Sequence, residues 1–198
     1  MDERKNMCKY ANTGMVKVTT EKQLSVINRT LEQKPSENKN NVVDSKFNTQ
    51  LWVNKKTQLI DRFDGEYAFL SNFFEAPVLY RGTRYRNTEA AFQAQKCIEP
   101  ADQIRFADLD PSQAKRLGRK IDLRSDWEQI KIREMYLIVL AKFQQHSDLR
   151  QKLMDTGFAY LIEGNYWRDT FWGVCDGIGE NHLGQILMRV REELQQNI

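Results

Sequence analysis

Dense apolar patterning begins at Leu59, and its first stretches have the short, turn-bounded form that is typical of strands. This pattern predicts a strand over Gln58–Phe63 and another over Tyr160–Glu163. Between these two segments, Ala76–Arg86 predicts a hairpin that turns near Arg81-Gly82.

Most of the other apolar residues follow helical spacing, and capping residues indicate where the helices begin. In the middle of the chain this predicts two helices: one over Glu89–Ile98, capped by Asn87 or Thr88, and one from Asp110-Pro111 to about Gly118.

The second half of the domain is predicted to hold three more helices. Ser125-Asp126-Trp127-Glu128 has the form of a capping box that opens the longest one. Leu149–Met154 predicts a short helix closed by Gly157, and Asn181 is the expected cap of a terminal helix. The predicted core stripe of the longest helix is Ile132, Met135, Tyr136, Val139 and Phe143. That of the terminal helix is Leu183, Ile186, Leu187, Val190 and Leu194.

These elements predict an α+β fold: one compact, helix-dominated domain over residues 55–198 with a few short strands. Residues 1–54 read as an N-terminal extension. Within it, Thr20–Gln23 resembles a capping box before a short helix that carries Leu24, Ile27 and Leu31. The polar segment Lys34–Asn41 follows, and it has the composition of a linker.

Charge changes the picture only locally. The net charge is +3, but the first 50 residues hold nine Lys and Arg against six Asp and Glu, while residues 51–198 hold 21 of each. The domain is therefore not expected to present a broad cationic surface to nucleic acid. Any recognition of phosphate has to be local.

Several protein classes are excluded by composition. No apolar run approaches the roughly 20 residues of a membrane span, and the N-terminus lacks the apolar stretch of a secretory signal. Three widely spaced cysteines and two histidines argue against a disulfide scaffold and against a Cys/His zinc site. We therefore expect a cytoplasmic protein without a metal site and without a membrane partner.

The first candidate for chemistry is the predicted helix after Asn87. Glu89, Gln93 and Lys96 fall at i, i+4 and i+7, so they project from one face. The small residues Ala90, Ala94 and Cys97 allow close packing behind that face. Two interpretations stay open, a functional acid–ammonium pair and an ordinary solvated ion pair.

The second candidate is Glu163–Gly184, 22 residues that contain half of the chain's ten glycines and two of its four tryptophans. Its large flat side chains suit stacking on a base, and Glu163 and Asp169 add carboxylates. Gly177–Gly179 leads into the terminal helix, whose free N–H groups are a plausible phosphate site. The segment is either a functional loop or an irregular one whose tryptophans fill the core. Its stacking candidates are Trp167, Phe171 and Trp172.

Together the two segments favour metal-free acid/base chemistry on a nucleotide-like molecule. Several short motifs then resemble the YbiA/NADAR superfamily in their order from about Phe63 to Leu194. These motifs are Phe69–Phe73, Thr88-Glu89 with Phe92–Lys96, Ala114–Arg119, Trp127, Lys142-Phe143, Asp169 with Trp172-Gly173, Asn181–Gly184 and Leu187-Met188.

The resemblance implies a helix-rich α+β fold and N-glycosidase activity without a cofactor. Two kinds of activity are known in the superfamily: cleavage of ribosylamine phosphates, which are early riboflavin intermediates, and removal of ADP-ribose from guanine in nucleic acid. Both substrates join a sugar to an exocyclic amine of a nucleobase-like ring. The expected partner is therefore a molecule containing ADP-ribose or ribose phosphate, with ADP-ribosylated DNA or RNA as one form.

Carried onto this chain, the resemblance implies Glu89 and Asp169 as acid and base, with Lys96 beside Glu89. Ser71 and Asn72 would contact sugar or base, and Trp172 would form a pocket wall. The substrate-binding residues implied are Ser71, Asn72, Phe73, Gln93, Arg119, Trp127, Trp172, Gly173, Asn181 and Gly184, with Asn181, Gly184 and Arg119 on the phosphate side.

One departure bears on the substrate. Many relatives place a histidine directly after the motif glutamate, where this chain has Ala90. Together with the basic first 50 residues, this departure favours ADP-ribosyl-guanine over the riboflavin intermediate. A binding module that holds ADP-ribose without cleaving it and a helical interaction protein are the alternatives from other classes. The sequence leaves the oligomeric state open.

Overall fold

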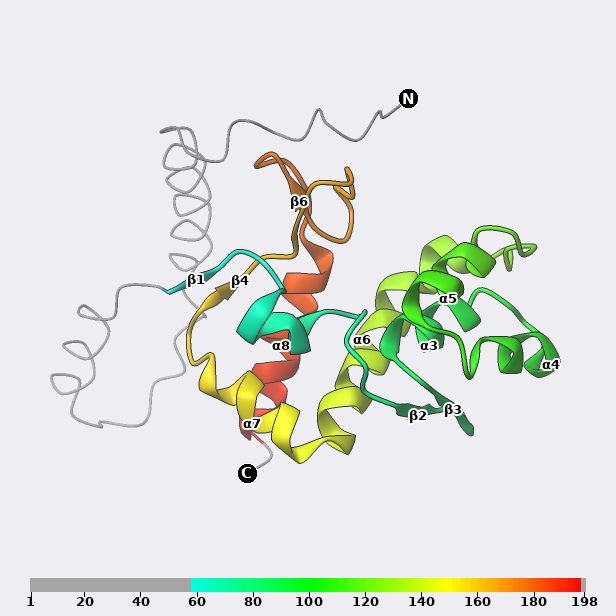
Figure 1. Cartoon of the computed structure of the whole chain (residues 1–198), viewed down its shortest axis with the longest axis horizontal. Helices are drawn as coiled ribbons and strands as arrows, with labels where there is room; N and C mark the ends of the chain where they lie inside the picture. Colours follow the sequence, from blue (N-terminus) through cyan, green and yellow to red (C-terminus); the bar gives the residue numbers. More distant parts are fainter. Residues whose placement is uncertain (1–57, 197–198) are drawn as a thin grey trace, which may run out of the picture. The chain divides into compact units, whose positions relative to one another are not determined.

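The computed structural model describes residues 58–196, so the predictions for the N-terminal extension lie outside the described residues. Helices dominate the described domain and the strands are two or three residues long, which confirms the predicted α+β class (Figure 1). The elements in chain order are β1 (Leu59–Ile60), η1 (Gly65–Leu70), β2 (Val78–Tyr80), β3 (Thr83–Tyr85), α3 (Thr88–Ala94), α4 (Pro100–Gln103), η2 (Ile104–Phe106), α5 (Pro111–Gly118), α6 (Trp127–Gln145), α7 (Ser147–Asp155), β4 (Tyr160–Leu161), β5 (Gly164–Asn165), β6 (Val174–Cys175) and α8 (His182–Gln196).

The strands form three separate pairs. β1 pairs with β4 in parallel, with Ile60 opposite Leu161, and β5 pairs with β6 in parallel. β2 and β3 form the predicted antiparallel hairpin. Its turn lies at Arg81 and Gly82, whose positive φ angles of 48° and 81° fit the twist of a two-residue hairpin loop.

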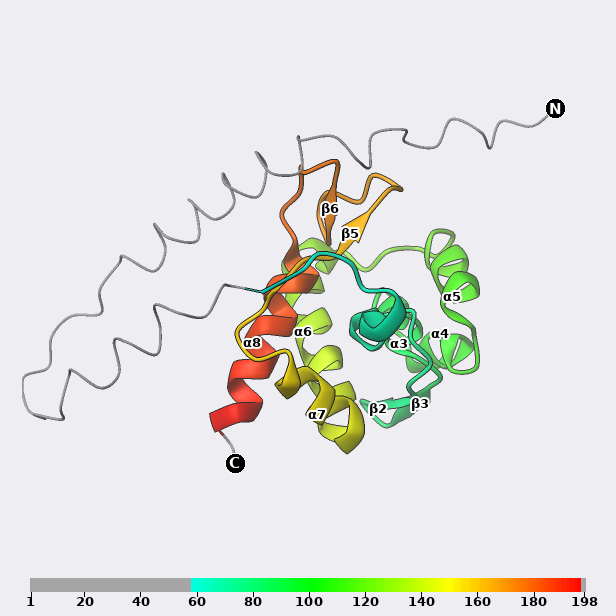
Figure 2. The same cartoon turned by 60° about the vertical axis from the view of Figure 1, so that its left-hand side comes forward.

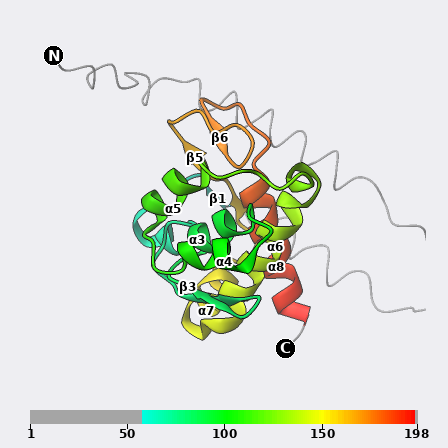
Figure 3. The same cartoon turned by 90° about the vertical axis from the view of Figure 1, so that its right-hand side faces the viewer.

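The core lies along α6, which packs against both α8 and α3. α6 packs along α8, and both views in Figures 1 and 2 show the two helices side by side. α3 packs against α5 and α6, and Figure 3 shows it surrounded by the neighbouring helices. All seven residues of α3 are buried, including its polar ones. Any side chain of α3 that performs chemistry is therefore held by core packing.

Capping explains several helix starts. The Asn87 side chain accepts a hydrogen bond from the Ala90 amide at 2.8 Å, which confirms Asn87 as the cap of α3. Asp110 and Gln113 form a reciprocal capping box at the start of α5. The terminal helix α8 buries its predicted apolar stripe: Leu183, Ile186, Leu187, Val190 and Leu194.

Other helix predictions were wrong in detail. α6 begins at Trp127 without a side-chain cap. The Asp126 carboxylate binds the Arg124 guanidinium at 2.6 Å, and the Glu128 carboxylate, the expected second half of the box, binds Lys131 at 2.6 Å. Ser125 therefore opens no capping box. Ile132, expected in the core stripe of α6, is 42% exposed. α3 ends at Ala94 rather than at Ile98, so Lys96 lies in the tight turn that follows the helix.

Candidate active site

Glu89 is positioned at the first turn of α3 by the segment that precedes the hairpin. Its backbone N–H donates to the Asn72 carbonyl oxygen at 3.1 Å, and the Thr88 hydroxyl donates to the same oxygen at 3.1 Å. The Glu89 residue is 6% exposed, and its Oε1 accepts a 2.8 Å hydrogen bond from Gln93 Nε2. The predicted pairing of Glu89 with Gln93 on one helix face is therefore present.

Two ammonium groups, those of Lys96 and Lys115, act on this carboxylate, and a guanidinium lies near Lys96. Lys96 Nζ lies 5.8 Å from the Trp127 ring centre and donates to the Gly118 carbonyl oxygen at 3.3 Å. Lys115, on α5, lies 5.6 Å from the centre of the Phe73 ring. Arg119, the residue that follows α5, is near enough to affect the charge of Lys96. The three cations make this edge of the site locally positive, although the domain as a whole is not.

Burial sets the proton affinities of the pair on and after α3. It raises the pKa of Glu89, while the Gln93 amide and the ammonium groups of Lys115 and Lys96 act in the opposite direction. Burial also lowers the pKa of Lys96, against the attraction of Glu89. Both shifts bring the pKa values of these groups closer to neutral pH, which suits proton transfer.

The loop that follows β4 brings two further carboxylates to Glu89. Asp169 lies near enough to add to the rise in the Glu89 pKa. Its Oδ1 accepts the Trp172 N–H at 2.9 Å, and the Asn165 side chain bonds both its N–H and its carbonyl oxygen. The second carboxylate is Glu163, which directly follows β4 and Ile162. Burial, followed by the charges of Asp169 and Glu89, raises the pKa of Glu163 to about 7.

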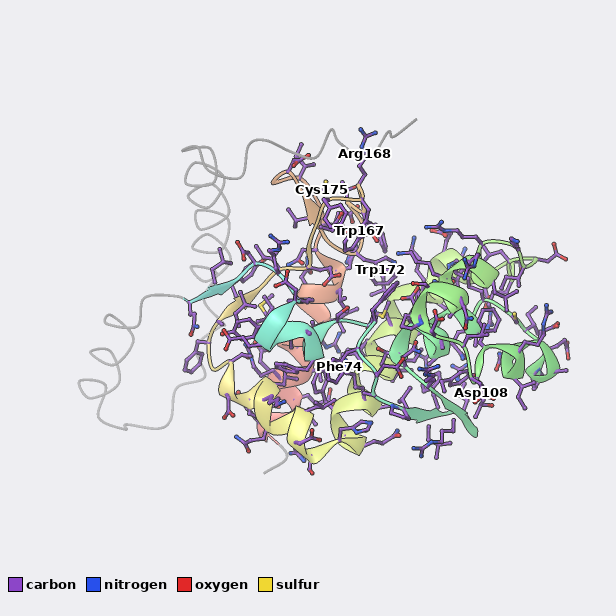
Figure 4. All side chains as sticks on the ribbon, in the orientation of Figure 1. Phe74, Asp108, Trp167, Arg168, Trp172 and Cys175 are labelled. Carbon is purple, nitrogen blue, oxygen red and sulfur yellow. The ribbon has the colours of Figure 1, made fainter. Side chains whose placement is uncertain are left out.

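An aromatic wall joins the helix to the loop. The Phe92 ring of α3 lies 5.1 Å from Trp127 and 5.2 Å from Trp172, centre to centre. Phe171 packs edge-on against Trp172 at 5.0 Å. In Figure 4, Trp172 lies on the side of the loop toward α3 and α5, whereas Arg168 lies at its far end. The acidic–ammonium pair and the tryptophan-bearing loop therefore converge in space.

A buried lysine holds the segment that carries Ser71, Asn72 and Phe73. Lys142 Nζ on α6 donates to the carbonyl oxygens of Phe69 at 2.7 Å and of Ser71 at 2.9 Å. The Ser71 hydroxyl accepts the Phe73 N–H at 3.1 Å. Burial lowers the pKa of Lys142 to about 7, and Glu163 opposes that change.

Two of the residues expected on the phosphate side, Asn181 and Gly184, contact backbone groups of the neighbouring segment. Asn181 Oδ1 accepts the Glu163 N–H at 3.0 Å, and Nδ2 donates to the Leu161 carbonyl oxygen at 2.9 Å. A Cβ on Gly184 would lie 2.2 Å from that same Leu161 oxygen. Gly173 likewise allows a close backbone approach, since a Cβ there would lie 2.1 Å from the Glu163 carbonyl oxygen. Substrate contact by these three residues stays a prediction.

The expected phosphate site at the start of α8 does not have the amides it needs. The N–H groups of His182 and Leu183 donate to the carbonyl oxygens of Phe171 and Trp172. The prediction that these leading amides are free was therefore wrong. The loop folds back onto the helix end and satisfies them, as buried helix ends require.

Two residues of this cluster were not among the predicted site residues. Glu163 was noticed only as a carboxylate of the loop segment, and Lys115 only as part of the Ala114–Arg119 motif. For Lys115 a signal exists, because it precedes Arg119 by four residues and so shares its helix face. For Glu163 the sequence gives none, since its approach to Glu89 depends on the path of the loop.

Three further observations concern the described domain as a whole. A surface groove of about 650 Å³ lies between α6 and α8, and it is lined by Ile132, Tyr136, His182 and Arg189 among others. Over residues 58–196, no three His, Cys, Asp or Glu side chains gather closely enough to hold a metal ion. Within the same range, no helix has both the length and the apolar character of a membrane span.

Comparison with known proteins identifies relatives of the whole described domain. A riboflavin biosynthesis protein of Vibrio vulnificus is 39% identical over 142 residues, which are 68% of this chain but 37% of that protein. An N-glycosidase of Nostoc punctiforme is 38% identical over 136 residues, or 65% of this chain and 86% of the relative.

The fold has a solved counterpart as well. The NMR structure of the Escherichia coli protein YbiA superimposes with a TM-score of 0.66 at 33% identity, and the match covers 72% of this chain and 88% of that one. The sequence model of the NADAR domain matches residues 60–195. The chain therefore belongs to the NADAR domain family.

Proposed function

We propose that the domain is an N-glycosidase that hydrolyses the bond between a phosphorylated ribose and the exocyclic amine of a nucleobase-like ring. One observation carries the proposal: the buried Glu89 of α3 and Asp169 of the loop approach each other beside the aromatic wall of Phe92, Trp127 and Trp172. Carboxylates that differ in environment, next to flat apolar surfaces, suit a sugar–amine bond attached to an aromatic ring. Relatives named N-glycosidase support the same class.

In this proposal Glu89 is the base. The Gln93 amide and two nearby ammonium groups favour its ionised form, while burial keeps its affinity for a proton high. Glu89 takes a proton from a water molecule, whose oxygen then bonds to the anomeric carbon. Asp169 orients that water or a ribose hydroxyl with the carboxylate oxygen that does not accept the Trp172 N–H.

The cations bind the phosphate of the substrate. Lys96, Lys115 and Arg119 lie around the Glu89 side of the site and form its locally positive edge. The carboxylates of Glu89 and Asp169, rather than the cations, stabilise the positive charge that develops at the anomeric carbon and ring oxygen as the bond to the amine breaks. The proposal therefore predicts tighter binding of a phosphorylated riboside than of its dephosphorylated form.

The names of the relatives favour a riboflavin-type ribosylamine phosphate over the ADP-ribosyl-guanine expected from Ala90 and the basic N-terminal extension. Ala90 itself is completely buried. Its replacement of the relatives' histidine therefore changes no group on the exposed surface of the domain. ADP-ribosyl-guanine in nucleic acid stays as the second candidate, and exposed aromatic side chains support it. Tyr166 is 75% and Trp167 51% exposed in the loop, where each offers a face to a further base.

The test is incubation of the purified full chain with each substrate, followed by mass spectrometry of the released sugar. Glu89→Gln should lower the rate by about 100-fold, since it removes the proton acceptor but keeps the side-chain shape. Glu75→Gln is the control, because Glu75 is an exposed residue paired with Arg86. Release from neither substrate overturns the proposal. Binding of ADP-ribose without release supports a non-catalytic module instead.

A further inference from the structure

The three carboxyl groups of the site differ in their hydrogen-bond partners. Glu89 accepts from the Gln93 amide, and Asp169 accepts from the Trp172 N–H. Glu163 Oε2 is inaccessible to solvent and has no hydrogen-bond partner. Donated hydrogen bonds stabilise a carboxylate, whereas a buried carboxyl oxygen without a donor favours the protonated form.

We propose that Glu163 is a catalytic residue, the general acid that protonates the leaving amine; this inference rests on the proposed N-glycosidase function. As the bond between the anomeric carbon and nitrogen breaks, its electron pair stays on nitrogen, and the proton of the Glu163 carboxyl group joins that nitrogen. Water forms the new carbon–oxygen bond and gives its proton to Glu89. The products are the free sugar and the neutral amine, and a proton exchanged with solvent returns Glu89 and Glu163 to their starting states.

The backbone around Glu163 is built to fix its side chain. Its N–H donates to Asn181 Oδ1 at 3.0 Å, and its carbonyl oxygen accepts the Val174 N–H at 2.9 Å. Gly173 lies so close that a Cβ there would come within 2.9 Å of Glu163 Cγ. The side chain is held closely, and because the residue is only partly buried, its carboxyl group meets a bound substrate in the fixed orientation that proton transfer needs.

The charged groups around Glu163 set when it holds its proton. Asp169 and Glu89 favour the protonated form, whereas Lys115 and Lys142 favour the ionised form. With burial, the balance gives a pKa of about 7, so the acid is half protonated near neutral pH. Because only the protonated form can donate, the rate should fall as pH rises through about 7.

The experiment measures kcat/KM against pH for the full chain with a ribosylamine phosphate. The wild type should lose activity on the alkaline side of about pH 7. Glu163→Gln should be about 100-fold slower below pH 7 and should lack this alkaline fall, because glutamine does not titrate. Glu163→Asp keeps a titrating carboxyl group one methylene shorter, and it should retain the alkaline fall at a reduced rate.

The outcomes separate this inference from the function on which it rests. A wild type that cleaves no N-riboside overturns the N-glycosidase proposal itself. A wild type that cleaves the substrate without an alkaline fall, or a folded Glu163→Gln protein that keeps the fall or loses less than about 3-fold, overturns only the part assigned to Glu163. The melting temperature of each variant reports whether it is folded. If Glu163→Gln does not fold, the folded Glu163→Asp protein decides the question, and an unchanged rate in it overturns the part assigned to Glu163. The wild-type fall alone does not decide it, since Lys142 also has a pKa of about 7.

Discussion

The helix α3 and the loop over residues 163–181 supply carboxyl groups to the same site by different physical means. Every residue of α3 is buried, and Glu89 moves only if the core around it moves. The loop instead exposes large side chains, with Tyr166 75% and Ile178 71% exposed. Its two carboxyl groups are therefore placed by hydrogen bonds and close backbone contacts, not by burial of apolar surface.

The loop is held in shape by hydrogen bonds from its asparagine side chains to backbone groups. The Asn165 side chain bonds both ends of the Asp169 peptide unit, and Asn181 ties Glu163 to β4. Arg168 and Asp176 have positive φ angles of 64° and 50°, a backbone conformation that L-residues rarely adopt. Such a loop tolerates little change in its backbone, whereas a methyl group added beside α3, at Gly118, would meet the Gln93 side chain and not backbone. The following predictions test that difference.

Gly173→Ala should have the largest effect. Its Cβ would lie 2.1 Å from the Glu163 carbonyl oxygen and 2.8 Å from Asn165 Nδ2, so backbone has to shift. We expect the unfolding free energy to fall by about 3 kcal/mol and the activity by at least about 1,000-fold. Urea denaturation and the glycosidase assay measure the two effects. Thr170→Ala, an exposed position in the same loop, is the control, and equal effects of the two changes would contradict the close fit at Gly173.

Lys142→Met tests the support of the helix side. Methionine leaves the Phe69 and Ser71 carbonyl oxygens without their shared donor, which should cost about 3 kcal/mol of unfolding free energy. The folded state lowers the pKa of Lys142 to about 7, so the wild type loses stability as pH falls toward 7, whereas methionine does not titrate. The deficit of the variant should therefore be larger at pH 9 than at pH 7.

Denaturation at the two pH values measures that deficit, and Lys120→Met at an exposed position is the control. A deficit that grows as pH falls would mean that the charged ammonium, rather than the neutral amine, stabilises the fold. The neutral amine has two protons to donate, and the structure gives it two acceptors.

The two halves of the site also differ in how far the sequence predicts them. Asn87 indicates the start of α3, as its cap. The four-residue spacing from Glu89 to Gln93 then places both side chains on one helix face, where they bond. That rule does not extend to Lys96, which lies beyond the helix end in a tight turn. Its charge still acts on Glu89, and its Nζ donates to the Gly118 carbonyl oxygen at the end of α5.

Rules based on local sequence spacing do not predict the contacts of the loop. Its glycines and tryptophans mark it as unusual, but nothing in their spacing predicts that His182 and Leu183 use their amides on the loop carbonyl oxygens. The start of α6 shows the same limit: Ser125–Glu128 has the pattern of a capping box, yet the Glu128 carboxylate binds Lys131 and the Asp126 carboxylate binds Arg124. In both cases a tertiary or neighbouring partner outcompetes the local pattern.

Asp169→Asn separates the charge of the loop carboxylate from its positioning. Asparagine keeps the oxygen that accepts the Trp172 N–H, so the loop should hold its shape and the stability should change little. Loss of the negative charge should lower kcat by about 10-fold, since water or a ribose hydroxyl is then oriented by a weaker acceptor. Asp176→Asn in the same loop is the control. Equal kcat values for wild type and Asp169→Asn would leave Asp169 with the positioning role alone.

Gly118→Ala should have the smallest effect, because here a methyl group meets a side chain and not backbone. Its Cβ would lie 2.0 Å from Gln93 Oε1, so Gln93 has to move away, and its hydrogen bond to Glu89 weakens. The crowding costs about 1 kcal/mol, which the better helix propensity of alanine at the end of α5 roughly offsets. Without the full Gln93 bond the pKa of Glu89 rises further, so the acid limb of the pH–rate profile should move to higher pH and the neutral rate should fall about 3-fold. A change in melting temperature as large as that of Gly173→Ala would show that α3 is as intolerant of a new methyl group as the loop, and the contrast between the two halves would be lost.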